Sequence, residues 1–306
     1  MTAGDPGPVL ITGLDHSGKT PLRVALEQLP ELALVRRAYL WTWFDGRFGP
    51  LDLRENLVRC LRAMAAHRPI AALQLDLDEI GERFASGEAS YDRLFALVGE
   101  AVARRAGRPR WGIQESGLEG HADRILGNLP GATFLHVVRD PRTWYAGVRA
   151  EAGARRRGGV GVASEVWRRS AALGLRNAQR YPARYLLIRY EELAADPTRA
   201  LDAVSRGLGI EPNDALRDAG RRLRLDPPAT LAPQLAAYLE ASAEEQMARL
   251  GYHGAAPLRG VDRLRFQLGT RPAGQLMALA WRAAERAGPG LSQLAGRGPG
   301  RKVNAS

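Results

Sequence analysis

The 306-residue chain contains a single cysteine, Cys60, which excludes a disulfide framework and any zinc or iron–sulfur site built from several cysteines. No apolar run approaches the about 18 residues that a membrane-spanning helix needs. The first residues contain no basic region followed by a long apolar stretch, so we expect no signal peptide and predict a cytoplasmic location. With 45% hydrophobic and 25% charged residues, the chain has enough apolar material for a folded core.

Lysine is scarce: Lys19 and Lys302 are the two lysines, and the other 42 of the 44 basic residues are arginine. The formal charge of +11 would suit a polyanionic partner, but so much arginine, alanine and glycine indicates a compositional bias. The sequence contains no clustered aromatic and basic motif of the usual nucleic-acid-binding modules, so we expect no nucleic-acid partner. A lysine inside a glycine-rich loop of such a chain indicates a chemical role for Lys19.

Three short apolar runs predict buried strands, and each of them ends at a polar motif: Pro8–Thr12, Thr133–Val138 and Tyr185–Ile188. Helical patterns separate these runs, beginning with Pro21–Leu29. Apolar strands that alternate with helices predict an α/β three-layer sandwich, in which helices cover both faces of a central parallel sheet. Ligands of such sheets bind at the carboxyl ends of the strands, where all three polar motifs fall.

The stretch 51–105 shows helical patterns and predicts a helical insertion, with Ala72–Leu77 as its one strand candidate. Arg149–Gly161 is rich in arginine and glycine and predicts a mobile surface loop. The insertion is expected to form a lid or to bind the acceptor. The Arg- and Trp-rich stretch Arg36–Arg54 and the loop Arg149–Gly161 are further expected places for acceptor binding.

The chain is expected to form one domain over residues 1–255, followed by a C-terminal region over residues 256–306. Gln275–Ala287 has the spacing of an amphipathic helix, and residues 288–306 are Gly/Arg-rich and predict disorder. The basic charge of this region would suit a peripheral contact with a membrane.

Residues 13–20 read Gly-Leu-Asp-His-Ser-Gly-Lys-Thr and match G-x-x-x-x-G-K-T between a predicted strand and a predicted helix. In such a loop, backbone N–H groups and the helix N-terminus bind phosphate oxygens, and the lysine adds positive charge. The sequence therefore predicts a P-loop NTPase-like fold and a phosphate-bearing ligand at the loop, bound by Gly13, Ser17, Gly18, Lys19 and Thr20.

Three further motifs resemble one enzyme family. LHVVRDPRTWYAGVRA (135–150) resembles the segment by which sulfotransferases bind the 3′-phosphate of 3′-phosphoadenosine 5′-phosphosulfate (PAPS). LLIRYEELAADPTRALDAVSRGLGIEP (186–212) is similar to a later stretch of these enzymes, and RWGIQESGLEGHADRI (110–125) to their Trp-Gly segment. The resemblance covers roughly residues 8–255, with the motifs in the family's order. It implies that the sulfuryl group of PAPS is transferred to a hydroxyl of a carbohydrate or natural-product acceptor by in-line displacement.

The resemblance also assigns individual residues. It places Ser17, Gly18, Lys19 and Thr20 at the 5′-phosphosulfate and Arg139 at the 3′-phosphate, and it implies no metal. Guanidinium geometry suits a charge-assisted contact of Arg139 with phosphate. Tyr190 stands where family members place a tyrosine near the adenosine.

Several positions depart from the family pattern. His16 replaces the basic residue before Ser-Gly and Lys19 replaces the first threonine, so the cationic role has moved by three positions. Gly147 stands in place of a serine that usually follows the 3′-phosphate arginine by eight residues. Gln114 replaces a common lysine. These departures leave the strength of donor binding open.

Three residues are candidates for the base that takes the acceptor's proton. Asp45 lies near the position of a glutamate in carbohydrate-modifying members, Glu115 lies near the position of a histidine in small-molecule members, and His16 lies in the loop itself. Asp45 could equally be a turn residue before Gly46, and Glu115 a solvated or ion-paired carboxylate. Lys19 would stabilise charge on the leaving oxygen.

The strict loop match allows an alternative, a P-loop kinase or nucleoside triphosphatase that uses ATP and Mg²⁺. Such an enzyme needs an aspartate at the end of an apolar strand, and Leu73–Asp78 is the best candidate for that motif. This alternative leaves the Arg139-Asp140-Pro141 and Tyr190–Leu193 patterns unexplained. A non-catalytic nucleotide-binding protein is the third possibility.

Overall fold

The computed structural model describes residues 6–150, 159–225, 230–254 and 276. The chain divides into two compact units, which are described separately. The first unit holds residues 1–14, 18–138 and 176–225, and the second holds residues 15–17, 139–175 and 226–306.

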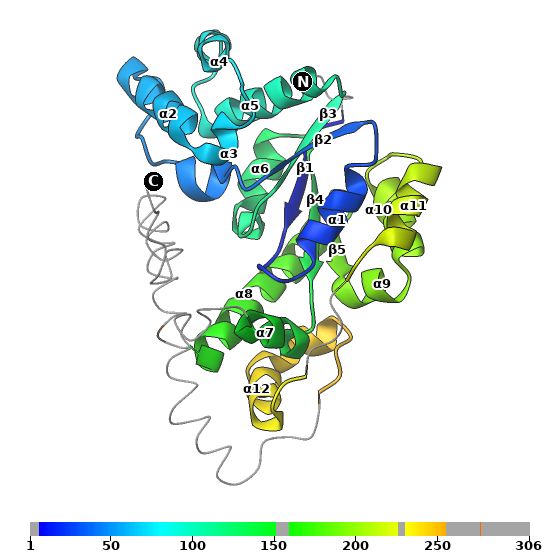
Figure 1. Cartoon of the computed structure of the whole chain (residues 1–306). Coiled ribbons are helices and arrows are strands. Elements are labelled where there is room, and N and C mark those ends of the chain that lie inside the picture. Colours follow the sequence, from blue (N-terminus) through cyan, green and yellow to red (C-terminus); the bar gives the residue numbers. More distant parts are fainter. Residues whose placement is uncertain (1–5, 151–158, 226–229, 255–275, 277–306) are drawn as a thin grey trace. The chain divides into compact units, whose positions relative to one another are not determined.

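The first unit is built on a sheet of five parallel strands in the order β2-β3-β1-β4-β5 (Figure 1). The strands are β1 (Val9–Thr12), β2 (Leu32–Arg36), β3 (Arg110–Gln114), β4 (Thr133–Val138) and β5 (Tyr185–Arg189). The chain leaves β1 toward β2 on one side of the sheet and leaves the neighbouring β4 toward β5 on the other. Ligands of open parallel sheets bind where the strand order reverses in this way, at the carboxyl ends of the strands.

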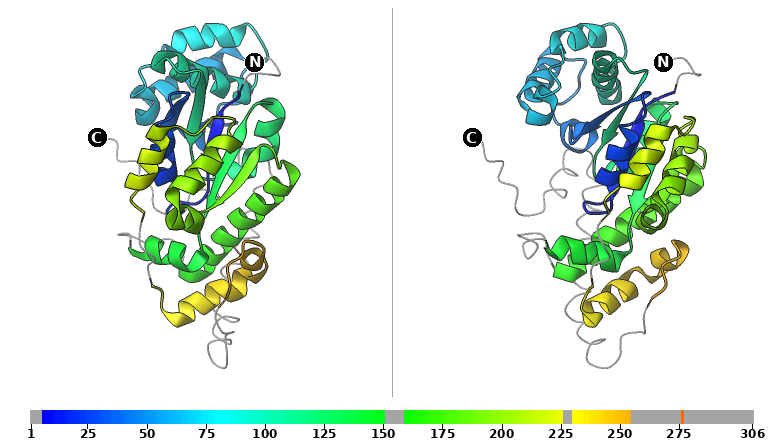
Figure 2. Two further views of the ribbon diagram at one scale, coloured as in Figure 1. Left: turned by 90° about the vertical axis from the view of Figure 1, so that its right-hand side faces the viewer. Right: turned by 45° about the vertical axis from the view of Figure 1, so that its right-hand side comes forward.

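Helices cover both faces of the sheet (Figure 2). One face carries α1 (Lys19–Leu26), α9 (Tyr190–Ala195), α10 (Pro197–Gly207) and α11 (Asp214–Arg222). The other face carries α2 (Arg54–Ala66), α3 (Arg68–Ala71), α4 (Leu77–Ala85), α5 (Tyr91–Ala106), α6 (Ala122–Asn128) and the short turns η1 (Leu40–Phe44) and η2 (Leu118–His121).

The side chains of β1 show why the sheet needs both layers. Val9 and Ile11 lie in the apolar cluster with α1 and α9–α11, whereas Leu10 lies in the cluster with α2–α6. All three side chains are fully buried. Successive side chains of a strand point to opposite faces, so a strand that is apolar throughout requires cover on both. The predicted α/β three-layer sandwich is confirmed.

The structure corrects the sequence in one helical segment. Residues 54–106 form α2 to α5, as expected of a helical insertion, but Ala72–Leu77 is not a strand. Gln74 adopts a left-handed backbone with φ +50°, and Asp76 caps α4 by accepting hydrogen bonds from the amides of Asp78 (3.1 Å) and Glu79 (2.9 Å). The strand-end aspartate that a kinase would need is therefore not found at Leu73–Asp78.

The second unit contains α7 (Pro141–Ala150), α8 (Gly159–Arg180) up to residue 175, and α12 (Pro233–Arg249). Arg142 of α7 bonds to Glu240 of α12 (2.8 Å) and forms a short ion pair with Asp140 (2.5 Å). Pairing with these two carboxylates raises the pKa of the Arg142 guanidinium, so its charge is permanent.

Two predictions fall largely outside the described residues. The expected mobile loop Arg149–Gly161 has residues 149–150 in α7 and 159–161 in α8, and the rest of it is not described. The expected helix Gln275–Ala287, apart from Leu276, and the basic tail lie outside the described part as well. Within the described ranges, no helix is both long enough and apolar enough to cross a membrane.

Candidate functional site

The loop after β1 depends on Gly18. This residue caps α1 with a left-handed backbone, φ +102°, that side-chain-bearing residues rarely adopt. A Cβ atom at position 18 would lie 2.3 Å from Cδ2 of the Tyr190 ring, so glycine is required for space as well as for conformation. Gly18 and Tyr190, which the family resemblance assigns to one ligand, are thus in direct contact within the first unit.

Lys19 begins α1 and is buried, with 4% of its surface exposed. Its ammonium donates hydrogen bonds to the carbonyl oxygen of Gly13 (2.6 Å) and to Oγ of Ser116 (2.6 Å). A buried ammonium must be paired or hydrogen-bonded, and these two oxygens hold it at the carboxyl ends of β1 and β3. The scarce lysine therefore occupies the place in the fold where a charge can act on a ligand.

Gln114, the residue that departs from the family lysine, connects the end of β3 to α1. Its Nε2 donates to Oγ1 of Thr20 (3.2 Å), and its Oε1 accepts from Nε of Arg23 (2.9 Å). Thr20 itself is exposed. The neutral amide thus positions the loop threonine through hydrogen bonds, without adding a charge.

In the second unit, Arg139 is held by several contacts and is 3% exposed. Its guanidinium donates to the carbonyl of His16 (3.3 Å) and to Oγ1 of Thr143 (3.2 Å), and its own carbonyl accepts from the indole of Trp167 (2.8 Å). The first two contacts orient the guanidinium, and the third holds the backbone of Arg139. The loop contributes through His16, whose backbone is left-handed with φ +67°.

Ser17 is 2% exposed, and its hydroxyl is buried without a hydrogen-bond partner among the described residues. Leaving a buried hydroxyl unpaired costs about 1–3 kcal/mol. In a loop that presents backbone amides to phosphate, such a hydroxyl is ready to bond to an oxygen of a ligand. This is the strongest sign in the structure that the loop binds something.

Gly147, which replaces a family serine, lies on α7 with open space around it. Among the described residues, and apart from the neighbouring residues and the backbone of α7 itself, no atom lies within 4 Å of a Cβ built at this position. A serine side chain would fit here, so crowding by these residues does not explain why the hydroxyl is missing.

Glu115, a candidate base, is fully buried beside η1. Its carboxylate accepts hydrogen bonds from the amides of Leu40 (3.0 Å) and Thr42 (2.8 Å) and from the Thr42 hydroxyl. Burial raises the pKa of Glu115 to about 7, and these three donors lower it in part. The structure thus gives Glu115 hydrogen-bond donors from one turn in place of the solvated or ion-paired environment considered above, and a pKa that suits proton transfer near neutral pH.

Asp45, the second candidate, lies at the end of η1 and is buried. Arg124 of α6 binds its carboxylate at 2.9 Å and reaches Asp92 of α5 at 3.3 Å. Asp92 also accepts a hydrogen bond from the Trp41 indole (2.6 Å). Asp45 is therefore an ion-paired residue that anchors η1 to two helices. His16, the third candidate, lies in the second unit.

The sequence did not identify several contributors. Ser116 and Thr42 form the contacts of Lys19 and Glu115, yet a lone serine or threonine carries no recognisable pattern. Beneath the loop, the Thr12 hydroxyl donates to the carboxylate of the buried Glu119 (2.5 Å), while Nδ1 of His136 bonds to the Tyr185 hydroxyl (2.8 Å). Burial lowers the pKa of His136, which favours the neutral ring. These long-range pairs become visible only in three dimensions.

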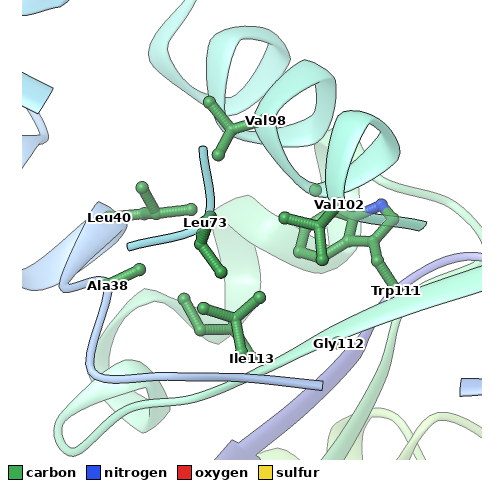
Figure 3. A pocket seen from close by; sticks show the side chains of 10 residues that line it. Ala38, Leu40, Leu73, Val98, Val102, Trp111, Gly112 and Ile113 are labelled. Carbon is green, nitrogen blue, oxygen red and sulfur yellow. The ribbon is translucent and has the colours of Figure 1, made fainter. Parts of the chain in front are cut away.

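A small apolar pocket lies behind η1, between β3 and α5 (Figure 3). Its lining consists of apolar side chains and glycines: Val35, Ala38, Leu40, Leu73, Val98, Gly99, Val102, Trp111, Gly112 and Ile113. Binding pockets usually combine an apolar lining with a few polar groups that orient the ligand. This gap is therefore part of the core packing and separate from the loop.

Comparison with known proteins shows the family and the fold of the chain. The solved structures that resemble this chain include the sulfotransferase domain from the curacin biosynthetic pathway, with 19% identity and a TM-score of 0.52, covering 82% of this chain and 99% of that one. They also include the sulfotransferase STF9 from Mycobacterium avium, with 13% identity and a TM-score of 0.51. That match covers 80% of this chain and 76% of STF9. These likenesses show the fold. No curated protein matches. A model of the Sulfotransferase family matches residues 8–214, so the chain belongs to the sulfotransferase family.

Proposed function

We propose that this sulfotransferase uses PAPS as its donor and transfers the sulfuryl group to a hydroxyl of a carbohydrate or small-molecule acceptor in the cytoplasm. The observation that carries the proposal is the unpaired, buried hydroxyl of Ser17, next to the glycine that closes the loop. An oxygen of the 5′-phosphosulfate would satisfy this hydroxyl. We assign residues 17–20 to that group, Arg139 to the 3′-phosphate and Tyr190 to the adenosine.

PAPS supplies a sulfuryl group that is activated by its bond to phosphate. In the transfer, the acceptor oxygen forms a bond to sulfur, and the bond from sulfur to the bridging oxygen breaks. The electron pair stays on that oxygen in 3′-phosphoadenosine 5′-phosphate (PAP). We assign to Lys19 the stabilisation of this negative charge, because hydrogen bonds to Gly13 and Ser116 already orient its buried ammonium.

The acceptor's proton needs a base. Of the three candidates, we assign this role to Glu115, reached through the hydroxyl of Thr42. Glu115 directly precedes Ser116, which binds Lys19, and Thr42 is half-buried, so its hydroxyl can meet an acceptor. The Thr42 hydroxyl would accept the acceptor's proton as it passes its own proton to the Glu115 carboxylate. A pKa of about 7 lets that carboxylate take and release a proton near neutral pH.

The test uses Ser17→Ala, and Ser205→Ala serves as its control. Ser17 has a hydroxyl that is unpaired in the free protein, whereas the buried Ser205 hydroxyl donates to the carbonyl of Ile210 (2.8 Å). We expect Ser17→Ala to weaken PAP binding about fivefold or more while the free protein keeps or gains stability. Ser205→Ala should lose stability and keep its PAP affinity. Calorimetric titration with PAP measures the affinity, and urea unfolding measures the stability.

The opposite pattern would contradict the proposal. If Ser17→Ala bound PAP as tightly as the unmodified protein, the hydroxyl would not face the donor, and the loop would not be a PAPS site of the proposed kind.

A further inference from the structure

Three buried polar side chains are linked by hydrogen bonds close to the residues that hold Lys19. The hydroxyl of Thr12, at the end of β1, donates to the carboxylate of Glu119 in η2 (2.5 Å). The side-chain amide of Asn177 in α8 donates to the carbonyl oxygen of Glu119 (2.9 Å). Each of these three residues is at most 3% exposed, and all belong to the first unit. A core accommodates such polar groups when they are paired, and the paired network holds its elements in one arrangement.

The bond between Thr12 and Glu119 joins the two chain segments that orient the Lys19 ammonium. Thr12 directly precedes Gly13, whose carbonyl oxygen accepts a hydrogen bond from Lys19 (2.6 Å). Glu119 follows three residues after Ser116, whose hydroxyl also accepts from Lys19 (2.6 Å). Thr12 and Glu119 are 107 positions apart in the sequence. Their hydrogen bond therefore helps to set the distance between the two oxygens that hold the ammonium.

This side-chain bond lies past the end of the backbone pairing between β1 and β3. The register of these strands ends where Ile11 stands opposite Gln114, and the amide of Glu115 then donates to the Ile11 carbonyl (3.0 Å). The residues that hold Lys19 come after this point in both segments. The bond from Thr12 to Glu119 thus continues the connection between the two segments to the place where Lys19 binds.

Charge links Glu119 to Lys19 as well. His136 of β4 stands opposite Thr12 in the sheet. Burial lowers the pKa of His136; the Glu119 carboxylate raises this pKa, and the Lys19 ammonium lowers it. Both charges therefore lie near enough to act on one ring, with opposite sign. A carboxylate in this place reduces the cost of burying the ammonium.

We propose that Thr12 and Glu119 are positioning residues for sulfuryl transfer, because their hydrogen bond keeps Gly13 and Ser116 where both can orient the ammonium of Lys19. The inference rests on the proposed function and deepens it, since Lys19 is the residue that we assign to the leaving oxygen. Neither positioning residue needs to touch the reacting atoms, because both act through Lys19.

The scarcity of lysine makes this ammonium observable by NMR. Protein labelled with ¹³C and ¹⁵N at lysine gives signals from Lys19 and Lys302, and Lys302→Arg identifies the signal of Lys19. Thr12→Val removes the hydroxyl and keeps the branched shape of the side chain, whereas Thr12→Ser keeps the hydroxyl. Glu119→Gln keeps the size of the side chain and removes its charge, and it provides a second variant should Thr12→Val not fold.

We expect Thr12→Val to shift the side-chain signal of Lys19 or to broaden it beyond detection. The rate of cleavage of radiolabelled PAPS, with water or 4-nitrophenol as acceptor, should fall about tenfold while PAP affinity is kept. Thr12→Ser should restore the signal and the rate, and Glu119→Gln should change both in the same direction as Thr12→Val. The control Ser205→Ala removes another buried hydroxyl of the first unit, so it should lose stability and change neither.

A double variant separates positioning from a general loss of structure. Added to Lys19→Ala, Thr12→Val should slow PAPS cleavage no further, because the ammonium that Thr12 positions is gone. The inference is overturned if the Lys19 signal is unchanged in Thr12→Val and Glu119→Gln, or if Thr12→Val slows the Lys19→Ala protein by the same factor as the unmodified protein. A protein that binds no PAP, or a normal rate in Lys19→Ala, contradicts the proposed function instead, and the Lys19 signal then still tests the arrangement inferred here.

Discussion

The loop Gly13–Thr20 and the segment Tyr39–Phe48 both follow strands of the same sheet, but they are held in different ways. The loop is shaped largely by its own residues: Gly13 and Gly18 have positive φ, and Lys19 bonds back to the Gly13 carbonyl. The segment is held by distant partners, among them Glu115 on η1 and Arg124 on Asp45. In the proposed function, the loop binds the donor and the segment lies on the side of the acceptor.

This difference in how the two regions are held suggests how related enzymes could share a donor and differ in their acceptors. The loop also touches the distant Ser116 and Tyr190, but its backbone is shaped by its own glycines, so it can persist through many changes elsewhere in the chain. A segment that depends on several other elements changes its shape whenever one of them changes, so acceptor recognition can vary while donor binding persists. Substitutions in the loop should therefore affect every reaction of the enzyme, and substitutions in the segment should affect the choice of acceptor.

The largest effect is expected at Lys19. Lys19→Ala should lower kcat by about 10²–10³-fold, as loss of an oxyanion-stabilising donor does, and should lower PAP affinity much less. Lys19→Arg should restore little, because the wide guanidinium cannot fit between Gly13 and Ser116 as the ammonium does. Steady-state kinetics and PAP titration measure both quantities. A near-normal kcat in Lys19→Arg would show that the geometry of the loop is unimportant.

On the acceptor side, Glu115 should make stability depend on pH. Its pKa is about 7 in the folded protein, against 4.5 ordinarily. Between these two pH values the folded protein keeps a proton that the unfolded chain has lost. The contribution to the free energy of unfolding is complete below pH 4.5 and is lost as pH rises through about 7, a decline of about 3 kcal/mol. Urea unfolding across this range should show the decline in the unmodified protein and not in Glu115→Gln. Parallel curves would mean that Glu115 is not the titrating group.

A smaller effect is expected at Arg139, which we assign to the 3′-phosphate of the donor. Arg139→Ala removes one charge-assisted contact, so binding of PAP should weaken by about 1.5–3 kcal/mol. Binding of adenosine 5′-phosphate, which lacks the 3′-phosphate, should barely change. Titration calorimetry with both nucleotides makes the comparison, and equal losses would show that Arg139 serves the His16 carbonyl and the fold instead.

The smallest effect is expected at Gly147. Because the space around it is open, Gly147→Ser should fold and add a hydroxyl near the proposed 3′-phosphate site, strengthening PAP binding by about 1 kcal/mol. Gly147→Ala should raise helix stability by about 1 kcal/mol without that gain in affinity. Weaker PAP binding in Gly147→Ser than in Gly147→Ala would contradict the assignment of this position to the donor.

The sequence predicted three strands of the sheet well because their apolar signals are local. Thr133–Val138 is a strand with the predicted bounds, and the strands at residues 9–12 and 185–189 differ from prediction by one residue at one end. Two strands were not predicted. Leu32–Arg36 has only four apolar residues before Arg36 and Arg37, which is a short signal. Arg110–Gln114 contains Trp-Gly between polar ends and shows no continuous apolar pattern.

The contacts of the segment Tyr39–Phe48 could not be predicted because they join residues far apart in the chain. Thr42 and Glu115 are separated by 73 positions, and Asp45 and Arg124 by 79. The prediction of a strand at Ala72–Leu77 was wrong for a related reason: alternating leucines resemble a strand, but Asp76 caps a helix there. Residue types alone do not reveal which distant partner satisfies a buried carboxylate.

The most direct test of the central claim is calorimetric titration of PAP into the protein in the presence of EDTA, with ATP and Mg²⁺ as the competitor in a separate EDTA-free titration. Because Lys19, Ser17 and Arg139 belong to the chain itself, the account predicts tight binding of PAP without metal and no effective competition by ATP. Loss of PAP binding in EDTA, or equal competition by ATP with Mg²⁺, would contradict it.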